Sequence, residues 1–119
     1  FKNINDRYGH KAGDAVLQGV AARVRGVLRE ADTVGRWGGD ELIVLLENVD
    51  RRKIPQLVEN IRRAAETPTA FGAHDLHVGA SIGAALAPDH GQTLGELVRT
   101  ADARMYEDKQ YRRAGTPAA

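Results

Sequence analysis

Residues 29–46 read READTVGRWGGDELIVLL, and this stretch decides how the rest of the chain is interpreted. Two short apolar runs flank a pair of glycines, with residues 33–37 before and residues 42–46 after Gly38 and Gly39. This pattern predicts a β-hairpin. Two adjacent carboxylates, Asp40 and Glu41, follow the glycines directly. Glycine lets an anion approach the main chain and carboxylates hold a metal, so the hairpin is a candidate site for a metal-bound phosphate.

An Arg-x-x-Asp step, from Arg29 to Asp32, comes immediately before the first predicted strand. Taken alone, such a step is often a surface ion pair that contributes little to stability. Glycine pairs followed by solvated acids are also common in ordinary turns. The interpretation of both features therefore depends on the rest of the chain.

Bulk composition narrows the classes of protein. The 119 residues are enough for one domain with a single core, and the net charge of +1 gives no overall field that attracts nucleic acid. The absence of cysteine excludes disulfides and thiolate metal sites and is compatible with a reducing cytoplasm. No apolar run has the length needed to cross a bilayer. We expect a cytoplasmic protein without a nucleic-acid partner or a membrane segment in this chain.

Hydrophobic periodicity predicts helices alternating with short strands. In chain order we expect a polar loop at 1–10, a helix at about 13–28, the hairpin, a helix at 54–65, a hairpin turn at 72–75, a strand at 76–86 and a helix from 93 to about 111. The last helix opens with a capping box formed by Thr93 and Glu96, and residues 114–119 are expected to be a disordered tail. The pattern indicates an α+β fold, with helices packed on an antiparallel sheet.

No strand precedes the polar loop, although a helix–hairpin–helix unit usually packs against a preceding strand, as in the ferredoxin-like arrangement. Either this fold lacks that strand or the sequence begins just after it.

Four segments together resemble the GGDEF domain, the catalytic domain of diguanylate cyclases. They are FKNINDRYGHKAGD at 1–14, GRWGGDEL at 35–42, SIGAA at 81–85 and ADARMYEDK at 101–109. The resemblance covers residues 1–113. It implies the GGDEF fold, a ferredoxin-like nucleotide-cyclase palm, here without its first strand.

That family joins two GTP molecules into cyclic di-GMP, a bacterial second messenger, with Mg²⁺ at each site and two domains in a head-to-tail homodimer. The resemblance implies that Gly38 and Gly39 make room for phosphates and that Asp40 binds the metal. Glu41 would assist the metal or the attacking hydroxyl. The other implied contacts are Asn5 and Asp14 to guanine, and Lys2, Lys109 and Arg113 to phosphates, with Lys2 counted beside Glu41 as catalytic. We expect Trp37 to pack at the hairpin rather than to stack on a nucleotide.

Two departures from the family pattern affect these expectations. Leu42 replaces the phenylalanine of the family name, an apolar exchange that a strand tolerates. In the family, the strand before the position of Phe1 ends in an acidic residue that completes the metal site. Without that carboxylate, Asp40 and Glu41 form a poor site for Mg²⁺, so we expect weak metal binding and little cyclase activity.

In many family members an Arg-x-x-Asp at this spacing forms an inhibitory site that binds the product, cyclic di-GMP. Arginine offers a planar fork to guanine or phosphate, and aspartate accepts from the guanine edge. This site needs no metal, so we expect Arg29 and Asp32 to bind cyclic di-GMP. The family often adds an arginine from the next helix. That position holds Asn60 here, with Arg62 and Arg63 nearby.

Three functions remain in view. The first is a fully active diguanylate cyclase, and the second is an impaired cyclase domain that still binds cyclic di-GMP through Arg29 and Asp32. The third is a dimerisation module that binds no nucleotide, which the segment from Gly38 to Glu41 disfavours. The sequence favours the second.

Overall fold

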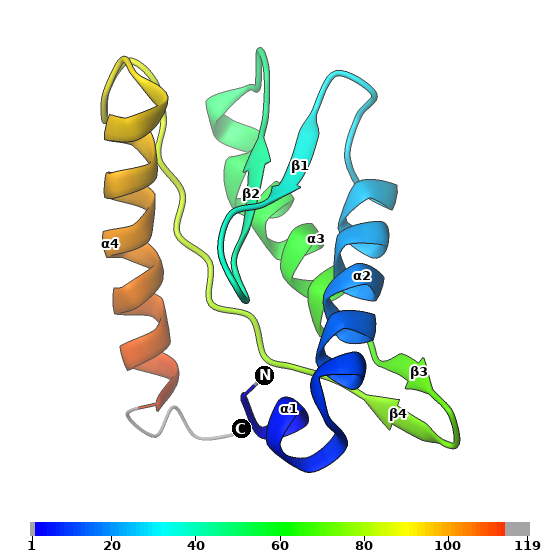
Figure 1. Cartoon of the computed structure of the whole chain (residues 1–119). Coiled ribbons are helices and arrows are strands. Elements are labelled where there is room, and N and C mark those ends of the chain that lie inside the picture. The colour runs from blue at the N-terminus through cyan, green and yellow to red at the C-terminus, as the bar shows by residue number, and fades with distance from the viewer. Residues whose placement is uncertain (1, 114–119) are drawn as a thin grey trace. The chain divides into compact units, whose positions relative to one another are not determined.

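The computed structural model describes residues 2–113, in which the chain forms nine secondary-structure elements (Figure 1). They are α1 (Lys2–Tyr8), α2 (His10–Gly26), β1 (Thr33–Arg36), β2 (Leu42–Leu45), the 3-10 turn η1 (Arg51–Lys53), α3 (Ile54–Glu66), β3 (Thr69–Phe71), β4 (His74–Leu76) and α4 (Leu94–Arg113). They fall into two compact units, Phe1–Gly79 and Ala80–Ala119, and each unit is described by itself. The expected tail at 114–119 lies outside the described residues.

The polar loop predicted for residues 1–10 is wrong, because Lys2–Tyr8 forms helix α1. Its polar side chains favour a turn, but Ile4 is buried, and this apolar anchor holds the segment as a helix against α2. Gly9 has a φ of 91°, which allows the chain to end one helix and begin the next. As a result, α2 begins at His10, earlier than the sequence suggested.

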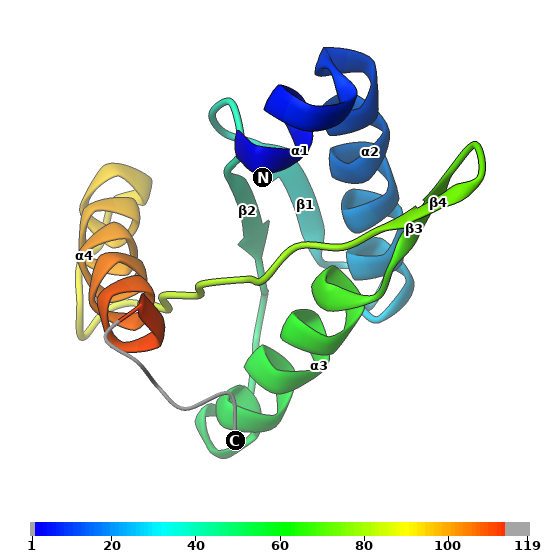
Figure 2. The same cartoon turned by 90° about the horizontal axis from the view of Figure 1, so that it is seen from below.

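The core of the first unit follows one stripe of α2. Its buried side chains are Ala12, Val16, Leu17, Val20 and Val24, to which α3 adds Ala65 and β4 adds Leu76. Figures 1 and 2 show α3 beside α2, with the β1–β2 hairpin next to both.

A partly buried polar link joins α2 to the end of α3. The guanidinium of Arg23 donates to Ala64 O at 2.7 Å, to Thr69 Oγ1 at 2.8 Å and to Ala65 O at 3.4 Å. These bonds satisfy carbonyl groups at the C-terminus of α3, which have no partner within the helix. Burial lowers the pKa of Arg23 from its ordinary value.

The predicted hairpin at the centre of the sequence is confirmed. Strands β1 and β2 pair antiparallel, with Thr33 opposite Leu45 and Arg36 opposite Leu42. The connection between them comprises residues 37–41, so the two glycines lie inside a longer loop rather than forming a two-residue turn. The end of the hairpin is therefore wide enough to expose main-chain groups.

The long strand predicted at 76–86 is wrong. A second antiparallel hairpin does form, and it pairs Thr69 with Leu76 and Phe71 with His74. The strand ends there, and residues 77–86 have no strand assignment. Period-two alternation places side chains on one face, but a strand also needs a hydrogen-bonded neighbour, and the described residues provide none for this segment.

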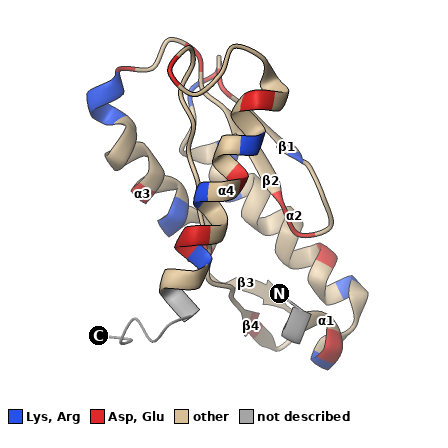
Figure 3. Ribbon diagram, turned by 90° about the vertical axis from the view of Figure 1, so that its left-hand side faces the viewer, with Lys and Arg blue, Asp and Glu red and all other residues tan. Residues whose placement is uncertain are grey.

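In the second unit, residues 80–93 run along α4. Ile82 N donates to Asp108 Oδ2 at 2.8 Å, and Arg104 Nη1 donates to Ala84 O at 2.9 Å. The predicted capping box is confirmed, since Glu96 N donates to Thr93 Oγ1 and Thr93 N donates to Glu96 Oε1, both at 3.2 Å. Figure 3 shows acidic and basic residues alternating along α4.

The class of the fold is α+β, as the sequence predicted. Within residues 2–113 the strands form two separate two-stranded antiparallel sheets rather than one larger sheet. None of the helices in this described range combines the length and apolar character that a membrane span requires.

Candidate functional site

The tip of the β1–β2 hairpin is held by few main-chain bonds. Trp37 N donates to Glu41 O at 2.8 Å, and Gly38 N donates to the same oxygen at 3.4 Å. Within residues 2–113, the N–H groups of Gly39, Asp40 and Glu41 have no hydrogen-bond acceptor. Three successive main-chain donors are therefore available at the tip. In many proteins, such runs of main-chain N–H groups bind anions.

Neither glycine of the tip is required by the fold of the described chain. Among the described glycines, positive φ occurs at Gly9, Gly72 and Gly91, and neither Gly38 nor Gly39 shares it. A Cβ built at Gly39 meets no heavy atom within 4 Å, and one built at Gly38 meets only Glu41 Cβ, at 3.8 Å. The space in front of these residues is therefore left open by the protein itself.

The two carboxylates of the tip are available for a cation. Asp40 is exposed and Glu41 is half-buried, and neither side chain forms a hydrogen bond or ion pair with any described residue. Mg²⁺ prefers such oxygen ligands but takes six of them. In the range 2–113 the structure contains no group of three or more acidic, histidine or cysteine side chains placed to hold a metal ion.

Trp37 does not pack at the hairpin as predicted, because its side chain is 56% exposed. The residue therefore lies at the surface of the hairpin tip, next to Gly38 in the sequence. As the single tryptophan of the chain, it gives a fluorescence signal located at the tip.

The residues expected to bind guanine lie at the junction of α1 and α2. Asn5 Oδ1 is buried and has no hydrogen-bond partner among the described residues, an uncommon state for a buried acceptor. It lies against Gly13, where a Cβ would come within 1.8 Å of it. Asp14, the next residue, is exposed on α2. The structure thus brings Asn5 close to the start of α2, with an acceptor that no donor within residues 2–113 satisfies.

Of the three predicted phosphate-binding cations, the structure describes the side chain of Lys109 only. Lys109 is exposed on α4, in the second compact unit. The side chains of Lys2 and Arg113 lie outside the described part of the structure. Their predicted roles remain predictions.

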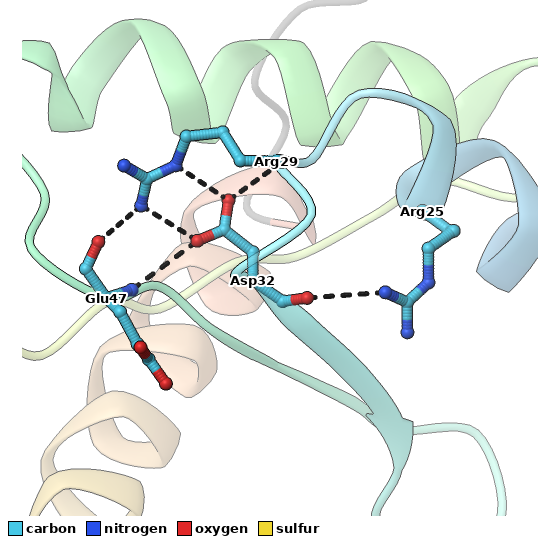
Figure 4. A network of polar contacts seen from close by, with 4 residues as sticks. All are labelled: Arg25, Arg29, Asp32 and Glu47. Atoms are coloured by element: carbon cyan, nitrogen blue, oxygen red, sulfur yellow. Dashed lines mark hydrogen bonds and ion pairs between the residues drawn. The ribbon is translucent and has the colours of Figure 1, made fainter.

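Arg29 and Asp32 form a closed pair at the base of the hairpin (Figure 4). The Asp32 carboxylate accepts from Arg29 N at 2.9 Å, Arg29 Nε at 3.1 Å and Arg29 Nη2 at 2.8 Å, and from Glu47 N at 3.4 Å. Arg29 Nη2 also donates to Glu47 O, and Arg25 Nη1 donates to Asp32 O at 3.3 Å. The network ties the entry of β1 to the exit of β2.

Exposure divides this pair into an outer and an inner member. The Arg29 side chain is 54% exposed, and the Asp32 side chain is 3% exposed. The hydrogen bonds from Arg29 lower the pKa of Asp32 to about 2, and the bond to Asp32 raises the pKa of Arg29. Both groups are charged at neutral pH, and a ligand that reaches the pair meets the guanidinium first.

On α3, the position at which the family often has an arginine holds Asn60. Its Oδ1 accepts from Gln56 Nε2 at 2.8 Å. Arg62 and Arg63 both pair with Glu59, at 3.2 Å and 3.4 Å. The neighbouring arginines on this helix are therefore held by an acidic residue of the same helix.

Sequence reasoning missed two residues of this region. Arg36 donates to Gly38 O from Nε at 3.2 Å and to Gly39 O from Nη2 at 2.7 Å, so its guanidinium spans the tip. An arginine that directly precedes a glycine-rich loop is the signal that could have found it. Glu47 contributes through its main chain, and main-chain contacts leave no mark in the sequence.

Comparison with protein families gives one match over nearly the whole chain. The family profile described as diguanylate cyclase, GGDEF domain, matches residues 1–114.

Relatives and solved structures agree with that match. The chain is 42% identical over 115 residues to the bifunctional diguanylate cyclase/cyclic di-GMP phosphodiesterase MucR of Pseudomonas aeruginosa. The alignment covers 97% of this chain and 17% of MucR. It is 33% identical over 110 residues to the cyclic di-GMP phosphodiesterase PdeR of Escherichia coli, covering 92% of this chain and 17% of PdeR. The crystal structure of the GGDEF domain of TpbB (YfiN) from Pseudomonas aeruginosa superposes with a TM-score of 0.85 at 40% identity, covering 92% of this chain and 70% of that one. The chain spans about a sixth of the length of MucR and of PdeR.

Proposed function

The chain belongs to the GGDEF domain family of diguanylate cyclases, and from this premise we propose that the β1–β2 hairpin binds nucleotides at both ends. The tip would bind the phosphates of GTP, and the base would bind cyclic di-GMP. Family membership alone does not decide the activity, since relatives include proteins named as phosphodiesterases as well as cyclases. The proposal therefore rests on the hairpin itself.

The observation that carries the proposal is the pair Gly38 and Gly39. Neither backbone conformation nor packing requires a glycine at these positions. A ligand that needs the space of a missing Cβ explains both residues. The unpartnered N–H groups of Gly39, Asp40 and Glu41 face such a ligand with three donors, and phosphate oxygens are the acceptors that suit them.

Guanine recognition is proposed for Asn5 and Asp14. Guanine carries hydrogen-bond donors at N1 and N2, and the buried Asn5 Oδ1 is an acceptor for which the described part of the chain supplies no donor. Asp14 adds an exposed carboxylate beside Gly13, the residue that Asn5 contacts. These two acceptors would suit a purine that carries donors at this edge.

The reaction proposed for this domain, from its family, joins two GTP molecules. The ribose 3′-hydroxyl of one GTP loses its proton and attacks the α-phosphate of the other, and pyrophosphate leaves. Bound Mg²⁺ would neutralise charge on the phosphate oxygens. Asp40 would hold the metal, Glu41 would support the metal or the attacking hydroxyl, and Lys2, Lys109 and Arg113 would hold phosphates. Each domain of a homodimer would hold one GTP.

We expect the 119-residue polypeptide by itself to bind Mg²⁺ weakly and to turn over little GTP. Its hairpin offers the carboxylates of Asp40 and Glu41, and Mg²⁺ must take its other ligands from phosphates, from water or from a group outside residues 2–113. Cyclase assays with GTP and Mg²⁺ test this expectation. Turnover that Asp40→Ala abolishes would contradict it.

Cyclic di-GMP binding is proposed for the base of the hairpin, which needs no metal. The exposed guanidinium of Arg29 would stack on a purine, and its Nη1, which has no partner among the described residues, would donate to guanine O6 or N7. The oxygens of Asp32 already accept four hydrogen bonds. Asp32 would therefore fix the arginine, and a direct bond to guanine requires exchange of one of these contacts.

Calorimetry with cyclic di-GMP on the parent protein and on Arg29→Ala tests this site. We expect the variant to lose binding, because the group that meets the ligand is removed. Arg52→Ala is the matched control, since it removes one positive charge from a side chain that is 90% exposed and paired with Asp50. Equal affinity in the parent and in Arg29→Ala would exclude the proposed product site.

A further inference from the structure

Arg36, the last residue of β1, holds two carbonyl groups of the hairpin tip. Its Nε donates to Gly38 O at 3.2 Å, and its Nη2 donates to Gly39 O at 2.7 Å. These two oxygens belong to consecutive peptide groups. A planar guanidinium presents two parallel donors, which matches two neighbouring acceptors.

The direction of these carbonyls fixes the direction of two amides. In a trans peptide the N–H points opposite to the C=O, and neither of these two peptide bonds is cis. The N–H of Gly39 shares a peptide with Gly38 O, and the N–H of Asp40 shares one with Gly39 O. By holding both oxygens, Arg36 turns both N–H groups away from itself.

We propose that Arg36 is a positioning residue for the triphosphate of the bound nucleotide. The amides it orients have no acceptor within residues 2–113, so they remain free for phosphate oxygens. This inference rests on the proposed GTP site at the tip and adds the residue that preorganises it. Donors held in place before a ligand arrives bind it without the entropy cost of ordering the loop.

A direct electrostatic role for Arg36 is the competing explanation. In that case the positive charge alone would attract the phosphates, and a lysine would serve nearly as well. Positioning requires the fork instead, because a single ammonium group does not span two carbonyl oxygens with fixed geometry. The variant Arg36→Lys therefore separates the two roles.

Binding is measured by Trp37 fluorescence and by calorimetry on the parent, Arg36→Lys, Arg36→Ala and the control Arg52→Ala. The ligands are GTP with Mg²⁺, tripolyphosphate and guanosine. We expect Arg36→Lys and Arg36→Ala to weaken GTP and tripolyphosphate binding by about tenfold or more, equivalent to about 1.4 kcal/mol. Guanosine binding should not change, because the contacts proposed for guanine are at Asn5 and Asp14. General damage to the fold would weaken all three ligands together.

Amide resonances give a second test that needs no ligand. In ¹H–¹⁵N spectra of the free protein, both Arg36 variants should shift the Gly39 and Asp40 signals and leave signals of α2 in place. Unchanged tip signals, or GTP affinity in Arg36→Lys equal to that of the parent, would overturn the positioning role and leave the GTP site intact. If the parent protein bound neither GTP nor tripolyphosphate, the proposed GTP site would be overturned as well.

Discussion

Replacement of Gly39 by alanine should separate ligand binding from folding. The residue does not have positive φ, and a Cβ there meets no heavy atom within 4 Å. Alanine fits the folded conformation and restricts the unfolded chain, so stability should rise by about 0.4–1 kcal/mol. For a domain of this size the melting temperature should rise by about 2–4 °C.

The same methyl group should weaken GTP binding, because it enters the space in front of the three unpartnered amides. Forcing a methyl into occupied space costs roughly 1–3 kcal/mol. The dissociation constant for GTP should therefore increase by roughly 5- to 150-fold. A variant that is more stable and binds less tightly is the expected result.

Thermal unfolding followed by circular dichroism measures the first effect, and calorimetry with GTP measures the second. Gly9→Ala is the matched control for backbone conformation. Its Cβ also meets nothing within 4 Å, but its φ is 91°. With ψ at 169°, Gly9 lies in a region that is essentially restricted to glycine, where another residue costs of order 1–3 kcal/mol, so this variant should melt at a lower temperature.

Two results would refute the reasoning. A large loss of stability in Gly39→Ala would show that the tip needs glycine for folding. Unchanged GTP affinity in a well-folded Gly39→Ala would show that the open space is not where the phosphates bind.

Three further predictions concern the packing around the hairpin and along α4. Arg23→Met should lower the free energy of unfolding by about 1–3 kcal/mol, measured in urea, because partly buried carbonyl oxygens at the end of α3 lose their donor. An unchanged midpoint would contradict this. The Asp32 pKa is lowered to about 2, so its charge stabilises the fold above the unfolded pKa of about 4 and loses this effect as the pH falls through 2. Melting temperatures of Asp32→Asn should therefore vary less between pH 4 and pH 2 than those of the parent, and equal slopes would argue against the ion pair. Gly83→Ala should disturb α4, since its Cβ would come within 1.9 Å of Ala101 O; amide spectra that match the parent along α4 would contradict that contact.

Local sequence patterns correctly predicted the elements whose formation depends on residues close together in the sequence. The β1–β2 hairpin, helix α3 and the capping box of α4 were all found, because alternation, helical periodicity and the Thr93–Glu96 spacing act within a few residues. Helix α1 was missed because the polar composition of residues 1–10 hides the single anchor Ile4. The strand at 76–86 failed for the opposite reason, since a correct local pattern lacks a pairing partner in the described chain.

The site shows the same division. The sequence identified Gly38 to Glu41 and the Arg29–Asp32 step as candidate ligand-binding residues. It did not reveal that Asp32 is buried beneath Arg29, because Glu47, 15 residues away, supplies part of the enclosure. Nor did it reveal the role of Arg36, because an arginine beside glycines has many possible conformations. These tertiary contacts change the roles expected of the pair: Arg29 is the residue that a ligand would meet, and Asp32 holds Arg29 in place.

Crossed calorimetric titrations test the two-site hairpin most directly. GTP with Mg²⁺ and cyclic di-GMP are each titrated into the parent, Gly39→Ala and Arg29→Ala. The two-site account predicts that Gly39→Ala loses affinity for GTP and keeps cyclic di-GMP, while Arg29→Ala loses cyclic di-GMP and keeps GTP. If each substitution weakened both ligands equally, or if neither changed either ligand, the hairpin would not carry two separate nucleotide sites.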